Sequence, residues 1–387
     1  MYETIREGKA SIRIKKASKI SKEMDVFYNP VMELNRDITI LLLQQFSPMN
    51  LCDPLAASGI RSIRFSKELK YKSIAINDVN EKAVKSIKNS LKLNKINNFA
   101  TMNKPLKKLN NTIKNNNKIS IHNEDANLFL LNSKGFDYID VDPFGTSNSY
   151  LEAAIKRISR NGILAVTNTD TAALTGTYPK ACVRKYWSSN KKNYLMHETG
   201  LRILIRKIQL IGMQYEKALF PVFSYFKNHY FRIFFQCIKG KRLCNEIALE
   251  HGMFNGAGPL WRGSLFDSRL VNRMYASLLK HYNDKNGNTR NSIENNTIIN
   301  KKLNNSQNNN ELLKFLKIIK DESKINAVGF YDIHDIAKKR KLKIIMRKEE
   351  LIKKIKKKGF KAASTHFLGT GIRSDIPYDN FLTLLKE

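Results

Sequence analysis

Short apolar runs recur along the first half of the chain, and each is ended by polar or turn-forming residues. Between them, at residues 60–69 and 81–91, apolar side chains return at helical spacing. Strands that alternate with helices predict a parallel β-sheet with helices on both faces. The apolar runs span residues 49–52, 73–76, 119–122, 138–141 and 163–167.

A long helical pattern at residues 195–211 is followed by two more apolar runs, 218–226 and 230–238. Only three residues separate these runs, which predicts an antiparallel hairpin. Alternating strands and helices closed by a hairpin are the layout of a class I, Rossmann-like methyltransferase domain. We therefore expect an α/β domain of this class at residues 1–240, which includes an N-terminal extension. A smaller α+β domain is expected at residues 241–387.

The second half of the chain contains a strongly basic segment. Residues 338–361 hold 13 basic and two acidic residues, and their apolar side chains fall near helical spacing. This pattern predicts one helix with an apolar stripe and a basic face, which is either simply solvated or in contact with an RNA backbone. The stripe comprises Ile344, Ile345, Leu351, Ile352 and Ile355.

Two stretches, residues 103–118 and 283–310, are rich in Asn and lack periodicity. They are typical of solvated loops or disorder, and the second is expected to be a loop inside the C-terminal domain.

The charge of the chain indicates a polyanionic partner. Lys and Arg number 68 against 34 Asp and Glu, a formal net charge of +34. Nucleic acid is the first candidate and an anionic membrane surface the second, although an AT-rich genome, which inflates Lys, Asn and Ile, gives the same bias. The chain has no apolar run of about 18 residues, and residues 1–22 lack the apolar core of a signal peptide. These features predict a cytoplasmic protein.

Residues 53–61 follow the first predicted strand with small side chains, as a loop that approaches a nucleotide-like ligand does. Only Gly59 is glycine, so the segment matches neither the dinucleotide fingerprint nor a P-loop, and alone it is equally an ordinary turn. Asp78 ends the next strand and could bind ribose hydroxyls. Asp125 ends the third and could accept from an adenine amine, with the backbone of Ala126 beside it. Each acid alone could cap a helix, but together they favour a cofactor site.

Asp142, Pro143 and Phe144 end the fourth strand. A carboxylate there can accept an N–H of a conjugated amine and orient its lone pair, while an aromatic ring stacks on the base. The alternative is a turn that only closes the strand. A carboxylate rather than an amide favours guanine, whose amine and N1–H offer only donors.

Residues further from this strand end could complete a base site. Phe27 precedes a turn and could line a base pocket or belong to the core, and Arg36 could bridge the methionine carboxylate and the catalytic region. The polar residues 168–171 follow the fifth strand and could also line the pocket.

These motifs resemble those of the archaeal and eukaryotic tRNA (guanine-26-N2) dimethyltransferases, and the compact length is similar to that of archaeal members. The matching segments cover nearly the whole chain in family order. They are residues 27–30, 35–37, 57–65, 140–145, 169–174, 257–261, 365–367 and 370–375.

The resemblance implies S-adenosylmethionine as methyl donor, tRNA as substrate and transfer of one or two methyl groups to N2 of guanosine 26. It implies that Asp142 is the catalytic carboxylate, beside Pro143, and that Phe27 and Phe144 sandwich the guanine. The residues that it implies as cofactor contacts are Arg36, Asp78, Asp125, Ala126 and one or both of Arg61 and Arg64.

The chain departs from the family at its cysteines. Many relatives carry two Cys-x-x-Cys pairs before residues 258–261, whereas here only Cys237 and Cys244 lie in that region. We therefore expect no zinc. Two other functions stay open from the residues alone: an adenine N6-methyltransferase acting on rRNA or DNA, and a non-catalytic RNA-binding protein on the same scaffold.

Overall fold

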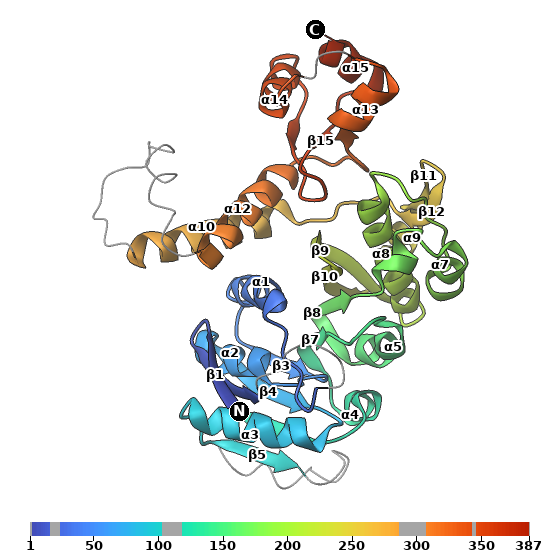
Figure 1. Cartoon of the computed structure of the whole chain (residues 1–387). Helices are drawn as coiled ribbons and strands as arrows, with labels where there is room; N and C mark the ends of the chain where they lie inside the picture. The colour runs from blue at the N-terminus through green and yellow to red at the C-terminus, as the bar shows by residue number, and fades with distance from the viewer. Residues whose placement is uncertain (1, 16–23, 103–117, 286–306, 343–345, 387) are drawn as a thin grey trace. The chain divides into compact units, whose positions relative to one another are not determined.

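The computed structural model describes residues 2–15, 24–102, 118–285, 307–342 and 346–386 (Figure 1). The chain forms two compact units, and each is assembled from three separate segments. Unit 1 comprises residues 1–171, 205–222 and 229–250, and unit 2 comprises 172–204, 223–228 and 251–387. The units therefore differ from two continuous domains that meet at residue 240, because residues 172–204 and 223–228 group with the C-terminal part.

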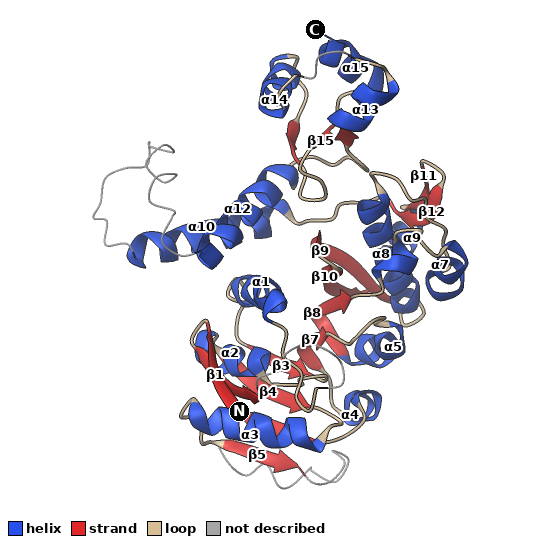
Figure 2. Ribbon diagram, in the orientation of Figure 1, coloured by secondary structure: helices blue, strands red, loops and turns tan. Residues whose placement is uncertain are grey.

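An eight-stranded sheet in the order β5-β6-β4-β3-β7-β8-β10-β9 carries the first unit (Figure 2). The six strands from β5 to β8 are parallel, and β10 runs antiparallel to β8. All five predicted strands and the predicted hairpin are present, which confirms the class I methyltransferase fold. The strands are β3 (Met49–Asp53), β4 (Tyr71–Asn77), β5 (Phe99–Met102), β6 (Ile119–His122), β7 (Phe136–Val141), β8 (Ile158–Asn168), β9 (Lys217–Lys227) and β10 (Tyr230–Lys239).

The helices between these strands bury an apolar face, as their periodicity predicts. Ile63 on α2, Ile87 on α3 and Leu151 on α5 are completely buried. The helices of this part of the chain are α1 (Glu33–Leu43), α2 (Ile60–Glu68), α3 (Glu81–Leu93), α4 (Ala126–Asn132), α5 (Asn148–Arg157), α8 (Met196–Met213) and α9 (Lys241–Leu249), and η1 (Pro30–Met32) is a single 3₁₀ turn.

The N-terminal extension forms a hairpin that was not predicted. Strands β1 (Tyr2–Glu7) and β2 (Ala10–Lys15) pair antiparallel, with Ile5 opposite Ile12. Ala10, Ile12 and Ile14 are buried, so β2 presents one apolar face in steps of two residues. This alternation of apolar with polar residues is itself a strand signal, which the sequence-based prediction missed.

The second unit contains smaller sheets and several helices. Its elements are α6 (Thr171–Leu174), α7 (Pro179–Tyr186), β11 (His251–Phe254), β12 (Ala257–Trp261), α10 (Ser268–Lys285), α12 (Gln307–Glu322), β13 (Tyr331–Asp332), α13 (Ile333–Lys339), α14 (Lys348–Lys357), β14 (Ala362–Ser364), β15 (Gly371–Ser374) and α15 (Tyr378–Lys386). The order β13-β15-β14 forms a three-stranded sheet, and α13, α14 and α15 share with it a core that includes Leu351, Ile372 and Phe381.

The prediction of one helix over residues 338–361 is wrong. Helix α13 ends at Lys339, and Lys341 adopts a left-handed conformation with φ +53°. The amides of Lys341 and Leu342 donate to the carbonyls of Lys338 and Ala337, a Schellman arrangement that terminates the helix. Helix α14 begins afterwards with Leu351 and Ile355 buried, whereas Ile344 and Ile345 lie outside the described residues.

The Asn-rich stretch at 283–310 is partly helical. Its first three residues belong to the end of α10 and its last four to the start of α12, so the loop prediction is wrong at both ends. Residues 286–306 and 103–117 lie outside the described part of the chain.

Candidate active site

The loop after β3 is held close to the ends of two neighbouring strands. The side chain of Asn77 is completely buried and donates to the carbonyl of Pro54 (3.0 Å) and to that of Glu124 (3.0 Å). Gly59 has φ +73°, and a Cβ on it would lie 2.7 Å from Ile87. The loop therefore needs glycine at this position both for its backbone conformation and for the close approach of α3.

The predicted acids lie at the ends of adjacent parallel strands. Asp78 follows β4, and its two carboxylate oxygens accept from the amides of Ala57 (2.7 Å) and Asn80 (2.9 Å). Asp125 is the N-cap of α4, and Ala126 is the first residue of that helix. Oδ1 of Asp125 accepts from the amides of Asn127 and Leu128, so Asp125 does cap this helix. Its side chain is nevertheless exposed.

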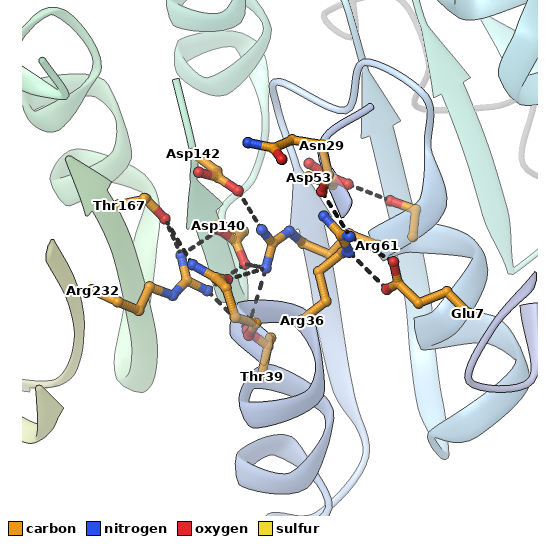
Figure 3. A network of polar contacts seen from close by, with 12 residues as sticks. Glu7, Asn29, Arg36, Thr39, Asp53, Arg61, Asp140, Asp142, Thr167 and Arg232 are labelled. Atoms are coloured by element: carbon orange, nitrogen blue, oxygen red, sulfur yellow. Dashed lines mark hydrogen bonds and ion pairs between the residues drawn. The ribbon is translucent and has the colours of Figure 1, made fainter. Parts of the chain in front are cut away.

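The carboxylate of Asp142 lies directly after β7 and is partly exposed. Its Oδ2 accepts a hydrogen bond from Nη2 of Arg61, which is buried on α2 (Figure 3). After Pro143 and Phe144, the amide of Gly145 donates to Oγ1 of Thr169 (2.8 Å), and the amide of Thr169 donates to the carbonyl of Gly145 (2.9 Å). The predicted polar segment after β8 thus supports the loop that carries Asp142.

Two further carboxylates lie beneath Asp142. Asp140 on β7 is fully buried; burial opposes its ionisation, but Arg232 and Arg61 outweigh burial and lower its pKa. Asp53 at the end of β3 accepts from Oγ of Ser62 (2.7 Å). Burial is the main cause that raises the pKa of Asp53 to about 7, and the nearby Asp140 and Asp142 add to it.

Arg36 and Arg64 are both paired with Glu7 of the N-terminal hairpin. Arg36 donates to Glu7 through Nε (2.7 Å) and Nη2 (2.5 Å). Nη1 of Arg64 lies 2.9 Å from Glu7 and 2.6 Å from Asp37, while Nε and Nη2 bond to Glu68. All three nitrogens of Arg64 therefore contact carboxylates. Among the three candidate arginines, Arg61 alone contacts Asp142 in the described structure.

Phe27 and Phe144 lie together, as expected for two residues of one base site. Their ring centroids are 4.3 Å apart and their planes meet at 78°, an edge-to-face contact. Phe144 is half exposed, although an apolar ring ordinarily packs inside. The two rings are thus adjacent, but in this arrangement no base fits between them.

Sequence reasoning missed four residues that organise this region: Glu7, Asn77, Asp140 and Arg232. Asp140 was visible as an acid inside an apolar strand, and Arg232 as a cation between the aromatic residues of a predicted strand. Their partners come from distant segments, and spacing along the chain could not identify them. Glu7 lies within residues 1–22, a mostly polar and charged segment in which it gave no separate signal.

The described residues show no metal centre and no transmembrane segment. Nowhere in these parts of the chain do three or more His, Cys, Asp or Glu side chains gather as metal ligands would. Cys237 and Cys244 are both buried as free thiols. Among the described helices, none combines the length and hydrophobicity of a transmembrane span. The expectation that zinc is absent stays a prediction.

A class I sheet with acids at successive strand ends and an Asp-Pro-Phe loop defines an S-adenosylmethionine-dependent methyltransferase. The family model of "N2,N2-dimethylguanosine tRNA methyltransferase" matches residues 8–255 and 288–386. The chain belongs to this family, which confirms the resemblance.

Relatives match along their whole length. The chain is 35% identical over 407 residues to the tRNA (guanine(26)-N(2))-dimethyltransferase of Pyrococcus horikoshii, covering 99% of this chain and 98% of that protein. It is 33% identical over 423 residues to the tRNA (guanine(26)-N(2)/guanine(27)-N(2))-dimethyltransferase of Aquifex aeolicus, covering 100% and 96%. The structure of Trm1 from Pyrococcus horikoshii in complex with S-adenosyl-L-methionine superposes with a TM-score of 0.81 at 32% identity, covering 100% of both chains.

Proposed function

We propose that this chain transfers one or two methyl groups from S-adenosylmethionine to N2 of guanosine 26 in tRNA. The observation that carries the proposal is the carboxylate of Asp142, which Arg61 holds at the end of β7 beside the exposed ring of Phe144. Family membership and two full-length relatives with this activity in their names support it.

One carboxylate oxygen of Asp142 binds the protein, and the other is available to the substrate. Arg61 holds Oδ2, and no hydrogen bond from the described residues reaches Oδ1. Oδ1 is therefore the acceptor for an N–H of the guanine amine, which turns the nitrogen lone pair toward the methyl group. Because the amine loses a proton in each transfer, Oδ1 is also positioned to accept that proton.

The rings of Phe27 and Phe144 hold the guanine once it has left the tRNA stack. Pro143 fixes its own φ and restricts Asp142 to extended backbone, so the carboxylate and the ring of Phe144 keep their relative placement. The reciprocal bonds between Gly145 and Thr169 secure the other end of this loop.

The residues present fit the cofactor. Two carboxylates follow adjacent strands: Asp78 would bind the ribose hydroxyls, and Asp125 with the backbone of Ala126 would bind the adenine. Bound there, S-adenosylmethionine supplies an electrophilic methyl group. Arg36 and Arg61 are the arginines that we assign to the cofactor side of the site. Arg64 is assigned a structural role, because each of its three nitrogens contacts a carboxylate.

Two basic surfaces of unit 2 are proposed to bind the tRNA: one lies within residues 241–387, where the resemblance implies RNA binding, and the other lies on α7, outside that range. Helix α14 exposes Lys353, Lys356 and Lys357 opposite its buried face. The other surface is the outer face of α7, where Lys180, Val183, Arg184 and Trp187 are exposed at helical spacing and Cys182 and Tyr186 are buried beneath.

The α7 surface fits RNA in two ways. Residues 178–192 contain five basic residues and no acidic one, which suits phosphates. Two half-exposed aromatic rings, Tyr178 and Trp187, provide faces on which unpaired bases stack.

Mass spectrometry of nucleosides from unmodified tRNA treated with wild-type protein and with Asp142→Ala tests the function. We expect N2-methylated and N2,N2-dimethylated guanosine with the wild type and at least about a thousandfold less with Asp142→Ala, because the orienting acceptor is gone. Asp321→Ala, which removes an exposed carboxylate on α12, is the matched control and should retain full activity.

Label in adenine would support the N6-methyltransferase alternative. Full activity of Asp142→Ala would refute the catalytic assignment. RNA binding without any methylated nucleoside from the wild type would favour the non-catalytic alternative. A cytoplasmic location remains an expectation from the sequence.

A further inference from the structure

We propose that Arg232 is a positioning residue for methyl transfer: it neutralises Asp140 and so leaves one edge of the Arg61 guanidinium available to hold Asp142. The inference rests on the proposed role of Asp142. Arg232 touches neither Asp142 nor a position assigned to the base or the cofactor, so it acts through two other side chains.

Arg232 lies on β10 and is completely buried. Its Nη1 and Nη2 each donate to one oxygen of Asp140, both at 2.8 Å, which makes a bidentate pair. Nη1 also donates to Oγ1 of Thr167 (2.9 Å), and Nη2 to Oγ1 of Thr39 (3.0 Å) (Figure 3). Nε of Arg232 has no hydrogen-bond partner in the described structure, so its two terminal nitrogens make all of these contacts. A buried arginine is costly, and this concentration of contacts on Asp140 and its neighbours indicates a specific role.

Asp140 stands between two cations. Besides Arg232, Nη1 of Arg61 lies 3.1 Å from its Oδ2, and the hydroxyl of Tyr138 donates to the same oxygen. Nη1 of Arg61 is also within hydrogen-bonding distance of Asn35 (3.1 Å) and Thr39 (3.3 Å), which hold the guanidinium in place. Arg61 thus turns one nitrogen toward Asp140 and the other toward Asp142.

The charges alternate along this line: Arg232, Asp140, Arg61, Asp142. The other titratable groups that interact with it are Cys52 and Asp53 on β3 and Tyr138 on β7. Without Arg232, the buried Asp140 would have Arg61 as its remaining cation in the described structure. A fully buried carboxylate attracts a cation more strongly than the partly exposed Asp142 does, because water screens it less. Arg61 would therefore turn toward Asp140 and release Asp142.

A charge-deletion cycle tests this mechanism in the full-length protein. The variants are Arg232→Met, Asp140→Asn, the double variant and Arg232→Lys, assayed for single-turnover methylation and for the KM of tRNA. We expect Arg232→Met to lose about tenfold or more in rate with little change in KM. The double variant should recover most of that loss, since the carboxylate that competes for Arg61 is gone. Arg232→Lys should lie between, because it keeps the charge without the fork.

A structural role predicts the opposite pattern, in which the double variant is no more active than Arg232→Met. Arg373→Met, which removes a buried arginine bound to two carboxylates in unit 2, controls for loss of stability. Arg373→Met should lower the melting temperature. Any loss of methylation rate that it causes should not be rescued by Asp140→Asn. Should Arg232→Met not fold, the comparison of Arg232→Lys with Arg232→Lys/Asp140→Asn decides. If Asp142→Ala is inactive and the double variant shows no rescue, the positioning inference fails while the proposed function stands; an active Asp142→Ala refutes both.

Discussion

The rings of Phe27 and Phe144 meet edge to face with their centroids 4.3 Å apart, so the structure shows the aromatic pair closed. A base stacked on both rings needs faces about 7 Å apart, because each stacked contact spans roughly 3.5 Å. If the two rings hold guanosine 26 as proposed, its entry must separate Phe27 from Phe144. The contact between the rings, about 1 kcal/mol, would then be exchanged for two stacking contacts with the base.

Phe27→Ala and Phe144→Ala are each expected to lower the methylation rate about 10- to 100-fold through the lost stacking. The KM of tRNA should change little, because most of the tRNA contacts lie elsewhere. With 2-aminopurine at position 26, the wild type should quench its fluorescence on binding and either variant should quench it less. Val31→Ala, at an exposed apolar residue, serves as control. Unchanged quenching in both alanine variants would disprove the stacking role.

Arg64→Met should destabilise the protein by about 3–5 kcal/mol and leave cofactor affinity within about threefold. The reason is that Glu7, Asp37 and Glu68 lose a shared buried cation, and removal of one partner from a buried ion pair is strongly destabilising. Denaturant unfolding and equilibrium binding of S-adenosylmethionine measure the two effects. Arg61→Met provides the contrast, with a large loss of activity. A stable Arg64→Met protein that no longer binds the cofactor would contradict the assignment.

Binding of tRNA should quench the fluorescence of Trp187. The chain has two tryptophans; Trp187 is 47% exposed and Trp261 is buried, so the response reports on α7. Trp187→Phe should abolish the quenching, and Trp187→Ala should weaken tRNA binding about tenfold through lost stacking. Met253→Ala, another exposed apolar side chain of unit 2, should bind normally. Equal affinity of wild type and Trp187→Ala would remove α7 from the interface.

Stability should fall as the pH rises toward 7 because of Asp53. Burial raises its pKa from the ordinary aspartate value of 3.8 to about 7, so between these pH values the folded state binds a proton that the unfolded state has released. Unfolding free energy therefore decreases with pH in this window, by at most about 1.4 kcal/mol per pH unit, and levels off above pH 7. Asp53→Asn should remove this slope. Urea unfolding at pH 5 to 8 checks it, and an unchanged slope would show that another group is responsible.

The sequence predicted the framework because strand and helix periodicities are local properties. Residues 138–141 and 163–167 are nearly continuous apolar runs, as buried parallel strands require, and they lie within β7 and β8. The break between α13 and α14 escaped prediction because it depends on the left-handed backbone of Lys341, where no glycine or proline gives a signal. The buried face of β2, by contrast, was signalled by the alternation at residues 10–15, and the prediction missed it.

For the candidate site, local motifs predicted residues but not the contacts between them. Asp142, Phe144 and Phe27 could be named from local motifs, and the structure brings them together. Whether Arg61, Arg64 or both contact the cofactor could not be decided from spacing, and this stays a prediction. The structure adds that Arg61 contacts Asp142, whereas Arg64 is paired with Glu7, which lies 57 residues away along the chain.

The pairing of Asp140 with Arg232 also has a consequence for synthesis of the protein. The two residues are 92 positions apart, so the carboxylate leaves the ribosome well before its cation. Until β10 has emerged, the central strands would bury Asp140 with Arg61 as its cation but without its bidentate partner, which opposes their premature closure. The ion pair between Asp140 and Arg232 thus couples completion of the sheet to the arrival of the hairpin that contains β10.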